Sequence, residues 1–159
     1  DWSSDVCSSD LAAQCRERGI PVEVVAPEPA ATFDDRVDAA LRSHGVELVC
    51  LCGYLRRFRV DAWTGRALNI HPALLPEFGG PGMYGERVHR AVLASGRRES
   101  GCTVHWVDPE YDHGAVVLQR RCPVLPGDTA ETLAARVFAE ERSAYPDAVR
   151  AVLSAPKGP

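Results

Sequence analysis

A nearly continuous apolar run from Val46 to Cys52 is the feature that most restricts what this chain can fold into. Glycines bound the run, and it follows a segment with the apolar periodicity of a helix, residues 32–44. Such a run is typical of a strand that is buried on both faces of a parallel sheet. Ala67 to Ile70 predicts a second short strand. We therefore expect an α/β fold with a mainly parallel central sheet.

Turn and capping signals place the remaining elements. One helix is expected to begin at a capping box formed by Thr32 and Asp35, and a long helix at a box formed by Asp128 and Glu131. Pro146 is expected to start a last helical segment after the long helix has ended. The other expected elements are helices at residues 11–18 and 86–95 and strands at residues 21–25, 101–107 and 115–122.

The length of 159 residues suits one domain with a single core. Residues 1–10 are rich in serine and aspartate, have no periodicity and resemble a translated adapter. We therefore expect residues 1–10 to be a non-native scar and residues 11–159 to form the folded domain, itself partial for the reason given below.

Charge and hydropathy favour a small-molecule ligand. The net charge of -4 and the pI of about 5.7 argue against nucleic-acid or anionic-membrane partners, which usually need a basic patch. No apolar run approaches the roughly 20 residues of a membrane-spanning helix, and the N-terminus lacks the pattern of a signal peptide. We expect a cytoplasmic protein.

The six cysteines lack both paired C-x-x-C spacing and the density of a disulfide scaffold. Reduced thiols are therefore expected, and no metal site is assigned. Cys50 and Cys52 flank one leucine in the apolar run, and we interpret them as small buried residues.

Three side chains, Asn69, His71 and Asp112, suit the stabilisation of an oxyanion at a carbonyl carbon without a covalent enzyme intermediate. Ligands of open parallel sheets bind beyond the carboxyl ends of the strands, where His71 is expected. An Asp112 carboxylate near His71 would orient the ring and favour the imidazolium form. The alternatives are a structural histidine bonded to backbone and a solvated aspartate that forms a turn.

Other polar residues leave alternatives open. His105 is interpreted mainly as a packed strand residue. The Gly79–Gly82 segment is not a phosphate loop, because no Gly-Lys-Ser/Thr follows, and a lid or hinge is expected. Arg56 and Arg57 could be a solvated pair or an anion contact. Glu141 lies on an apolar helical stripe, either as a salt-bridged boundary residue or as a group that binds hydroxyls or an amine.

Four segments together resemble the glycinamide ribonucleotide formyltransferase family, over a match from about Leu11 to Leu153. The segments are NIHPALLP at 69–76, FGGPGMYG at 78–85, SGCTVHWV at 100–107 and YDHG at 111–114, with Gln119 after them. The resemblance implies a three-layer Rossmann-like formyltransferase fold. It also implies transfer of a formyl group from 10-formyltetrahydrofolate, the co-substrate, to the amine of glycinamide ribonucleotide in purine synthesis, without a metal.

The resemblance also implies roles for individual residues. Asn69 and His71 would stabilise the oxyanion, and Asp112 would orient His71 and assist proton transfer through water. His105 would have a structural role or raise the pKa of the catalytic histidine, and Glu141 would contact the ribonucleotide. The folate pteridine would lie against Gly53, Tyr54, Leu55, Arg56, Arg57, Phe58, Asp108 and Tyr111.

The front of the chain departs from the family, whose members begin with a strand, a glycine-rich phosphate loop, a helix and a second strand. This pattern is absent here, so we expect residues 11–159 to be a partial formyltransferase domain, inactive or unstable as written. The alternatives are a formyltetrahydrofolate hydrolase, a methionyl-tRNA or nucleotide-sugar formyltransferase, and an inactive folate-binding fragment. A monomer or a homodimer is expected.

Overall fold

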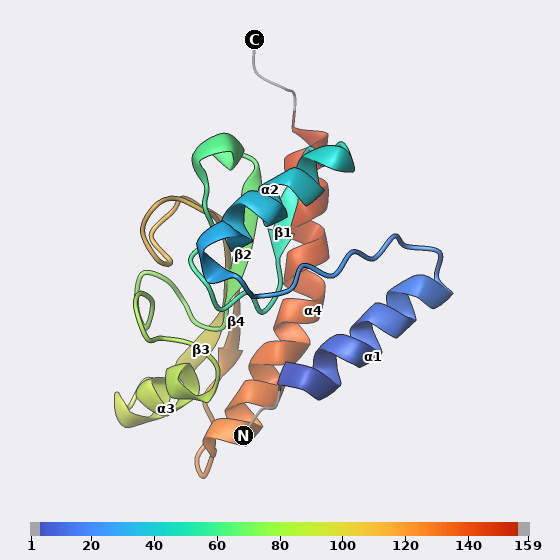
Figure 1. Ribbon diagram of the computed structural model, residues 1–159. Helices are drawn as coiled ribbons and strands as arrows, with labels where there is room; N and C mark the ends of the chain where they lie inside the picture. Colours follow the sequence, from blue (N-terminus) through green and yellow to red (C-terminus); the bar gives the residue numbers. More distant parts are fainter. Residues whose placement is uncertain (1–3, 156–159) are drawn as a thin grey trace. The chain divides into compact units, whose positions relative to one another are not determined.

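The computed structural model describes residues 4–155, with side chains from residue 11 onward (Figure 1). The chain divides into two compact units, residues 1–46 and residues 47–159. The first unit contains the helices α1 (Ser4–Glu17) and α2 (Phe33–Ser43) and a short 3₁₀ helix, η1 (Ala30–Thr32). The expected helices at 11–18 and after Thr32 are therefore confirmed, whereas the interpretation of residues 1–10 as a scar stays a prediction.

The second unit is a four-stranded sheet with two α-helices. Its strands are β1 (Val49–Leu51), β2 (Ala67–His71), β3 (Glu99–Trp106) and β4 (Val116–Pro123), its helices are α3 (Glu86–Ala94) and α4 (Ala130–Ser154), and η2 (Asp61–Trp63) is a 3₁₀ turn. The strands lie in the order β1-β2-β3-β4. The first pair is parallel and the other two pairs are antiparallel, so the α/β class holds but the described sheet is mixed rather than mainly parallel.

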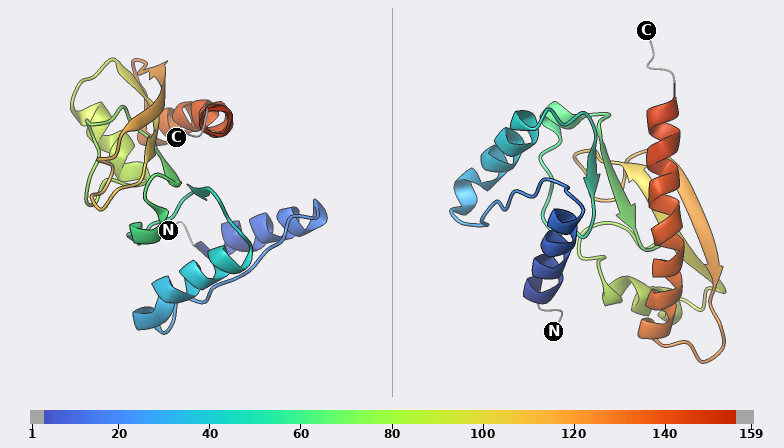
Figure 2. Two further views of the ribbon diagram at one scale, coloured as in Figure 1. Left: turned by 90° about the horizontal axis from the view of Figure 1, so that it is seen from above. Right: turned by 90° about the vertical axis from the view of Figure 1, so that its right-hand side faces the viewer.

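A single apolar core joins the sheet to both helices of this unit. Helix α4 packs on β3, β4 and α3, which the two views of Figure 2 show from different sides. Leu68 of β2, Val92 of α3, Val104 of β3 and Leu133 and Val137 of α4 are each at most 1% exposed. Fully burying such a side chain stabilises a fold by about 1.5–3 kcal/mol, so this cluster holds the strand ends at fixed positions.

The register of the sheet fixes which residues of β2 and β3 face each other. Asn69 pairs with His105 and His71 with Thr103. Farther along the β3–β4 pair, Val104 pairs with Leu118 whereas His105 pairs with Val116, so β4 contains one extra residue there, a β-bulge. The bulge lies at the end of β3 that leads into the 107–115 connection.

Three local predictions are wrong. Residues 21–25 form no strand, because they pair with none of the described strands, and Val24 is 76% exposed. Thr32 makes no side-chain cap bond, and the capping box of α4 is formed one residue later than expected, by Thr129 and Thr132. The Asp128 carboxylate instead forms two hydrogen bonds with Arg136, at 2.7 and 2.9 Å.

Pro146 lies inside α4 and does not begin a new segment, which corrects the prediction of a helix break. Residues before and after it, including Val137, Tyr145 and Ala148, are buried in the same core. A proline inside a helix removes one backbone hydrogen bond. The continuous helix indicates that burial on both sides of Pro146 outweighs this loss.

Cys50 and Cys52 are both exposed, so their interpretation as buried residues is wrong. Side chains alternate between the two faces of a strand, and in β1 only Val49 and Leu51 point to the packed face. Cys102 and Cys122 are buried, and the five cysteines whose side chains the structure describes are free thiols. Cys7 lies outside the residues with described side chains.

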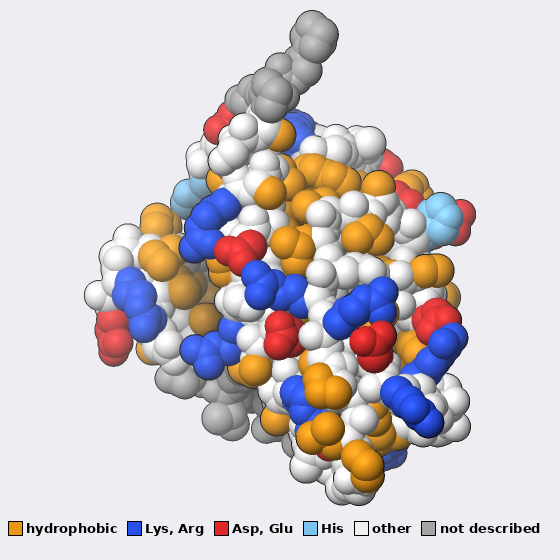
Figure 3. Space-filling view, turned by 180° about the vertical axis from the view of Figure 1, so that it is seen from behind, with side chains coloured by type: hydrophobic (Ala, Val, Ile, Leu, Met, Phe, Trp, Pro, Cys, Tyr) orange, Lys and Arg blue, Asp and Glu red, His pale blue; other side chains and the backbone are white. Residues whose placement is uncertain are grey.

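Opposite charges are interspersed among hydrophobic side chains on the face shown in Figure 3. Within the second unit, Arg121 pairs with Glu99 across β3 and β4 at 3.0 Å, and Arg150 pairs with Asp147 on α4 at 2.7 Å. Exposed pairs of this kind contribute only about 0–1 kcal/mol each. Stability therefore depends mainly on the apolar core.

The hydroxyl of Tyr145 bridges the two parallel strands. Its oxygen lies 3.0 Å from the Leu51 carbonyl oxygen and 2.9 Å from that of Leu68, so its one proton is shared between two buried acceptors. We predict that Tyr145→Phe lowers the free energy of unfolding by about 1–3 kcal/mol, because both carbonyls lose the tyrosine hydroxyl as a donor. Urea unfolding measures the loss. Tyr84→Phe, at an exposed position, serves as the control, and equal stability of the two variants would contradict the role of the bridge.

Candidate active site

The antiparallel pairing of β2 and β3 brings Asn69 beside His105. The Asn69 amide nitrogen lies 3.3 Å from Nε2 of His105, and Nδ1 of His105 lies 2.9 Å from the Trp106 carbonyl oxygen. A carbonyl can only accept, so Nδ1 carries a proton, and Nε2 lies between the Asn69 amide and the Asp112 carboxylate. His105 is buried, as expected for a structural role, but its charge lowers the pKa of His71, so the expectation that it raises this pKa is wrong.

Asp112 reaches the same place from the connection between β3 and β4. One carboxylate oxygen lies 3.4 Å from Nδ1 of His71, and the other lies 3.6 Å from Nε2 of His105. The Asp112 side chain is only 10% exposed. The structure thus brings Asn69, His71 and Asp112 together, with His105 between the amide and the carboxylate.

Burial dominates the protonation of His71, which ends β2 rather than standing just past it. Desolvation lowers the pKa of His71 below its ordinary 6.5, although the Asp112 charge and the Phe78 carbonyl act in the opposite direction. The expected effect of Asp112, which favours the imidazolium form, is therefore present, but burial outweighs it. The resting ring is neutral at neutral pH.

Asp112 itself stays ionised. Burial would raise its pKa, but the interaction with His105, the charge of His71 and the Gly80 amide together hold the pKa below its ordinary value. The Gly80 N–H donates to the Asp112 carboxylate at 3.0 Å. A carboxylate next to a neutral imidazole is a natural partner for a proton that arrives during a reaction.

Several contacts of the site were not predicted from the sequence. Nε2 of His71 lies 2.8 Å from the Phe78 carbonyl oxygen. The Thr103 hydroxyl, on the residue that pairs with His71, donates to the Ala73 carbonyl at 2.7 Å and accepts from the Leu75 N–H at 3.0 Å. Backbone groups carry no signal in side-chain patterns, and only the alternation of Thr103 with His105 on β3 could have indicated that both face the site.

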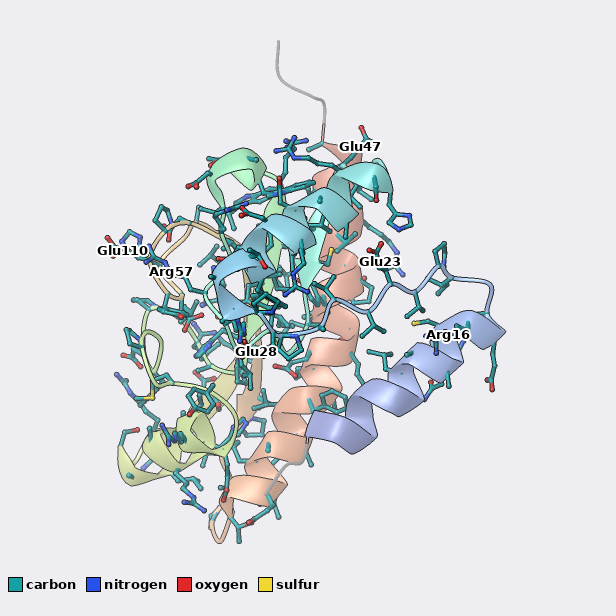
Figure 4. All side chains as sticks on the ribbon, in the orientation of Figure 1. Arg16, Glu23, Glu28, Glu47, Arg57 and Glu110 are labelled. Atoms are coloured by element: carbon teal, nitrogen blue, oxygen red, sulfur yellow. The ribbon has the colours of Figure 1, made fainter. Side chains whose placement is uncertain are left out.

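A hydrogen bond joins the two segments predicted to hold folate. The Arg57 guanidinium donates to the Pro109 carbonyl at 2.6 Å, and Figure 4 shows Arg57 and Glu110 close together. Arg57 is nevertheless exposed, so the two alternatives, a solvated side chain and an anion contact, both stay open. The contact brings residues 53–58 next to residues 108–112.

The predicted folate residues differ in their surroundings. Leu55 and Tyr111 are 73% and 46% exposed, whereas Phe58 is buried and lies edge-on to Tyr54, with ring centroids 6.0 Å apart. Gly53 has a φ of 67°, in the left-handed region that favours glycine. Arg56 is exposed at the surface.

Asp108 is occupied by its own turn rather than by the triad. Its carboxylate accepts from the Glu110 N–H at 2.8 Å and pairs with Nδ1 of His113 at 2.9 Å. Burial acts to raise the pKa of Asp108, but these partners hold it below the ordinary value. The same pairing raises the pKa of His113, so the two adjacent residues Asp112 and His113 belong to different networks.

Glu141 is partly buried on α4, and desolvation raises the pKa of its carboxyl to about 7. No salt bridge joins it to a basic side chain within residues 11–155, so the alternative of a salt-bridged boundary residue is wrong. Its role in substrate binding stays a prediction.

Neither a metal centre nor a membrane span is found in the described part of the chain. No group of three or more His, Cys, Asp or Glu side chains there could hold a metal ion. Among the described helices, none combines the length and the hydropathy needed to cross a membrane.

Comparison with known proteins places these residues in context. The formyl transferase family matches residues 6–149. A chloroplastic phosphoribosylglycinamide formyltransferase of Arabidopsis thaliana is 46% identical over 149 residues, which are 89% of this chain and 51% of that protein. The chain therefore spans about half the length of this plant relative.

Solved structures agree in fold. Glycinamide ribonucleotide transformylase 1 of Symbiobacterium toebii superposes with a TM-score of 0.77 at 40% identity, covering 87% of this chain and 66% of that one. A phosphoribosylglycinamide formyltransferase of Bacillus halodurans superposes with a TM-score of 0.79 at 28% identity, covering 89% and 74%. The expected Rossmann-like formyltransferase fold is confirmed.

We predict that the ring of His71 titrates below pH 6.5 and that Asp112→Asn lowers its midpoint further, because the carboxylate is the neighbour that favours the imidazolium. Lowering the pH from 6.5 to that midpoint should also destabilise the fold, because His71 binds a proton more readily in the unfolded chain than in the folded one. Ring NMR of the five histidines measures the midpoints. His113, with its raised pKa, is an internal control, and a midpoint that rises in Asp112→Asn would contradict the assignment.

Glu141→Gln should stabilise the fold at alkaline pH. The pKa of Glu141 is about 7 in the folded state and 4.5 ordinarily. The free-energy cost of burying the ionised carboxylate therefore increases as the pH rises from 4.5 through 7. At pH 8 we expect a gain of roughly 1–3 kcal/mol in the free energy of unfolding, and at pH 4 no gain. Denaturant unfolding at both pH values measures it, with Glu140→Gln on the same helix as the control. A gain that did not depend on pH would rule out this explanation.

Proposed function

The chain belongs to the formyl transferase family, and from this membership we propose that it takes part in purine biosynthesis by moving a formyl group from 10-formyltetrahydrofolate to the amine of glycinamide ribonucleotide. The names of its relatives support the reaction class. The observation that carries the proposal is the convergence of Asn69, His71 and Asp112 at the end of β2.

The proposed reaction begins when the substrate amine attacks the formyl carbon. A new C–N bond forms, the carbonyl oxygen becomes an oxyanion, and the intermediate then collapses by breaking the bond to the folate nitrogen. The Asn69 amide has two N–H groups and uses one toward His105, so the other is available as a donor to the oxyanion. In a site this buried, such a donor acts more strongly than it would in water.

His71 is proposed to move the proton. Because burial keeps the resting ring neutral, it can take the proton that the attacking amine releases. The imidazolium formed in this way lies 3.4 Å from the ionised Asp112 and adds a positive charge beside the oxyanion. The proton then passes to the departing folate nitrogen, so the enzyme returns to its starting state.

The substrates are proposed to bind on either side of this triad. Exposed Leu55 and Tyr111, on segments joined by Arg57, offer apolar surface to the folate pteridine. Glu141, with a pKa of about 7, suits a contact with hydroxyl or amine groups of the ribonucleotide. We further propose a cytoplasmic monomer or homodimer that acts on these small molecules, with neither nucleic acid nor membrane as a partner.

The proposal is tested by grafting this chain into the Symbiobacterium toebii protein in place of the matched segment and measuring formyl transfer, alongside the chain alone. We predict that Asn69→Ala in the graft lowers kcat by about 10²–10³-fold, as expected for loss of one oxyanion donor. Asp61→Asn, at an exposed position of η2, is the control. A folded graft without formyl transfer would reject the function, and release of formate in place of a formylated amine would indicate the hydrolase alternative.

A further inference from the structure

Two non-glycine residues of the described chain have a positive φ, and both lie at the candidate site. Phe78 has a φ of 56° and Asp112 a φ of 55°. Such a conformation is uncommon for a bulky residue such as Phe78, and it persists only where the surroundings hold it. The turn at Phe78–Gly80, here called the 78–80 turn, contacts both His71 and Asp112.

The 78–80 turn presses directly against Asp112. A Cβ added to Gly79 would lie 2.5 Å from Cδ2 of Leu75 and 3.1 Å from Cβ of Asp112, so a side chain here would have to displace Leu75 and crowd Asp112. The next residue, Gly80, donates its N–H to the Asp112 carboxylate at 3.0 Å. The turn therefore fixes the position and the rotation of the carboxylate together.

The segment before the turn is anchored in the sheet. Thr103, fully buried on β3, bonds the backbone at Ala73 and Leu75, and Gln119 of β4 donates to the Leu75 carbonyl at 2.8 Å and to the Thr103 hydroxyl at 2.9 Å. Hydrogen bonds from β3, from β4 and to Asp112 hold this part of the loop in one position. They favour a rigid segment over the lid or hinge expected for Gly79–Gly82.

The Phe78 carbonyl determines where the proton of His71 lies. A carbonyl oxygen only accepts, so Nε2 of His71, 2.8 Å away, must carry hydrogen. A neutral imidazole has one N–H, which leaves a lone pair on Nδ1, facing Asp112 at 3.4 Å. The other titratable groups that interact with His71 are His105 of β3 and His89 of α3.

We propose that the 78–80 turn is a positioning element that holds His71 in its Nε2–H tautomer, so that Nδ1 is the nitrogen that takes up and returns the proton. The role in catalysis rests on the proposed formyl transfer. In this arrangement a backbone carbonyl orients the ring from one side, and Asp112 stabilises the proton that arrives on the other. Phe78 and Gly79 thus act through His71 and Asp112 and need no contact with substrate.

The tautomer is measured on the full chain by NMR with ¹⁵N-labelled histidine rings, assigned with His→Gln variants. Above the titration midpoint of His71, we expect a protonated, pyrrole-type Nε2 and an unprotonated, pyridine-type Nδ1. The reverse pattern would overturn the proposal. This readout does not require turnover, so it separates failure of the tautomer assignment from failure of the proposed function.

Gly79→Ala tests the turn itself. The added methyl must displace Leu75 or Asp112, and we expect a mixture of His71 tautomers, a fall in kcat of about tenfold or more in the grafted enzyme, and a shifted pH dependence of kcat. KM should change less than kcat. Gly82→Ala is the control: its φ of 85° makes the substitution strained, but the new Cβ meets nothing within 4 Å, so the tautomer and the pH profile should stay unchanged. A folded Gly79→Ala variant with the original tautomer and pH profile would refute the role of the turn.

Discussion

The antiparallel pairing of β2 with β3 is the constraint on which the rest of the second unit depends. One register places Asn69 opposite His105 and His71 opposite Thr103, so four polar side chains at the end of the sheet are set by backbone hydrogen bonds. A slip of one residue would turn the pair on one strand to the opposite face from the pair on its neighbour. The apolar core of Leu68, Val104 and the helices prevents this slip, because the same slip would expose it.

Desolvation and nearby charges shift the pKa values of His71 and Asp112 in opposite directions. Burial keeps His71 neutral, while bonds from the surrounding residues keep Asp112 ionised at similar depth. The result is a proton acceptor beside a permanent negative charge, which is a stable resting pair only because backbone groups of Phe78 and Gly80 hold both members. Preorganisation of this kind avoids reorientation during a reaction.

Features that depend on residue type and on spacing along the chain could be predicted from the sequence. The runs around β1 and β2, the helix at 86–95 and the grouping of Asn69, His71 and Asp112 were predictable, because periodicity and residue type carry that information. The strand expected at 21–25, the buried Cys50 and the protonation of His71 were not, since each depends on what packs against it. The Phe78 carbonyl could not be predicted at all, because any residue supplies the same oxygen.

The β-bulge between β3 and β4 makes the position of Asp112 depend on the number of residues in this hairpin. Hairpin connections normally tolerate added or missing residues, because their tips project into solvent. Here the extra residue of β4 sets the point at which the 107–115 connection leaves the sheet, and Asp112 must return from that point to His71. An insertion or deletion on either side of Asp112 would therefore move its carboxylate away from His71.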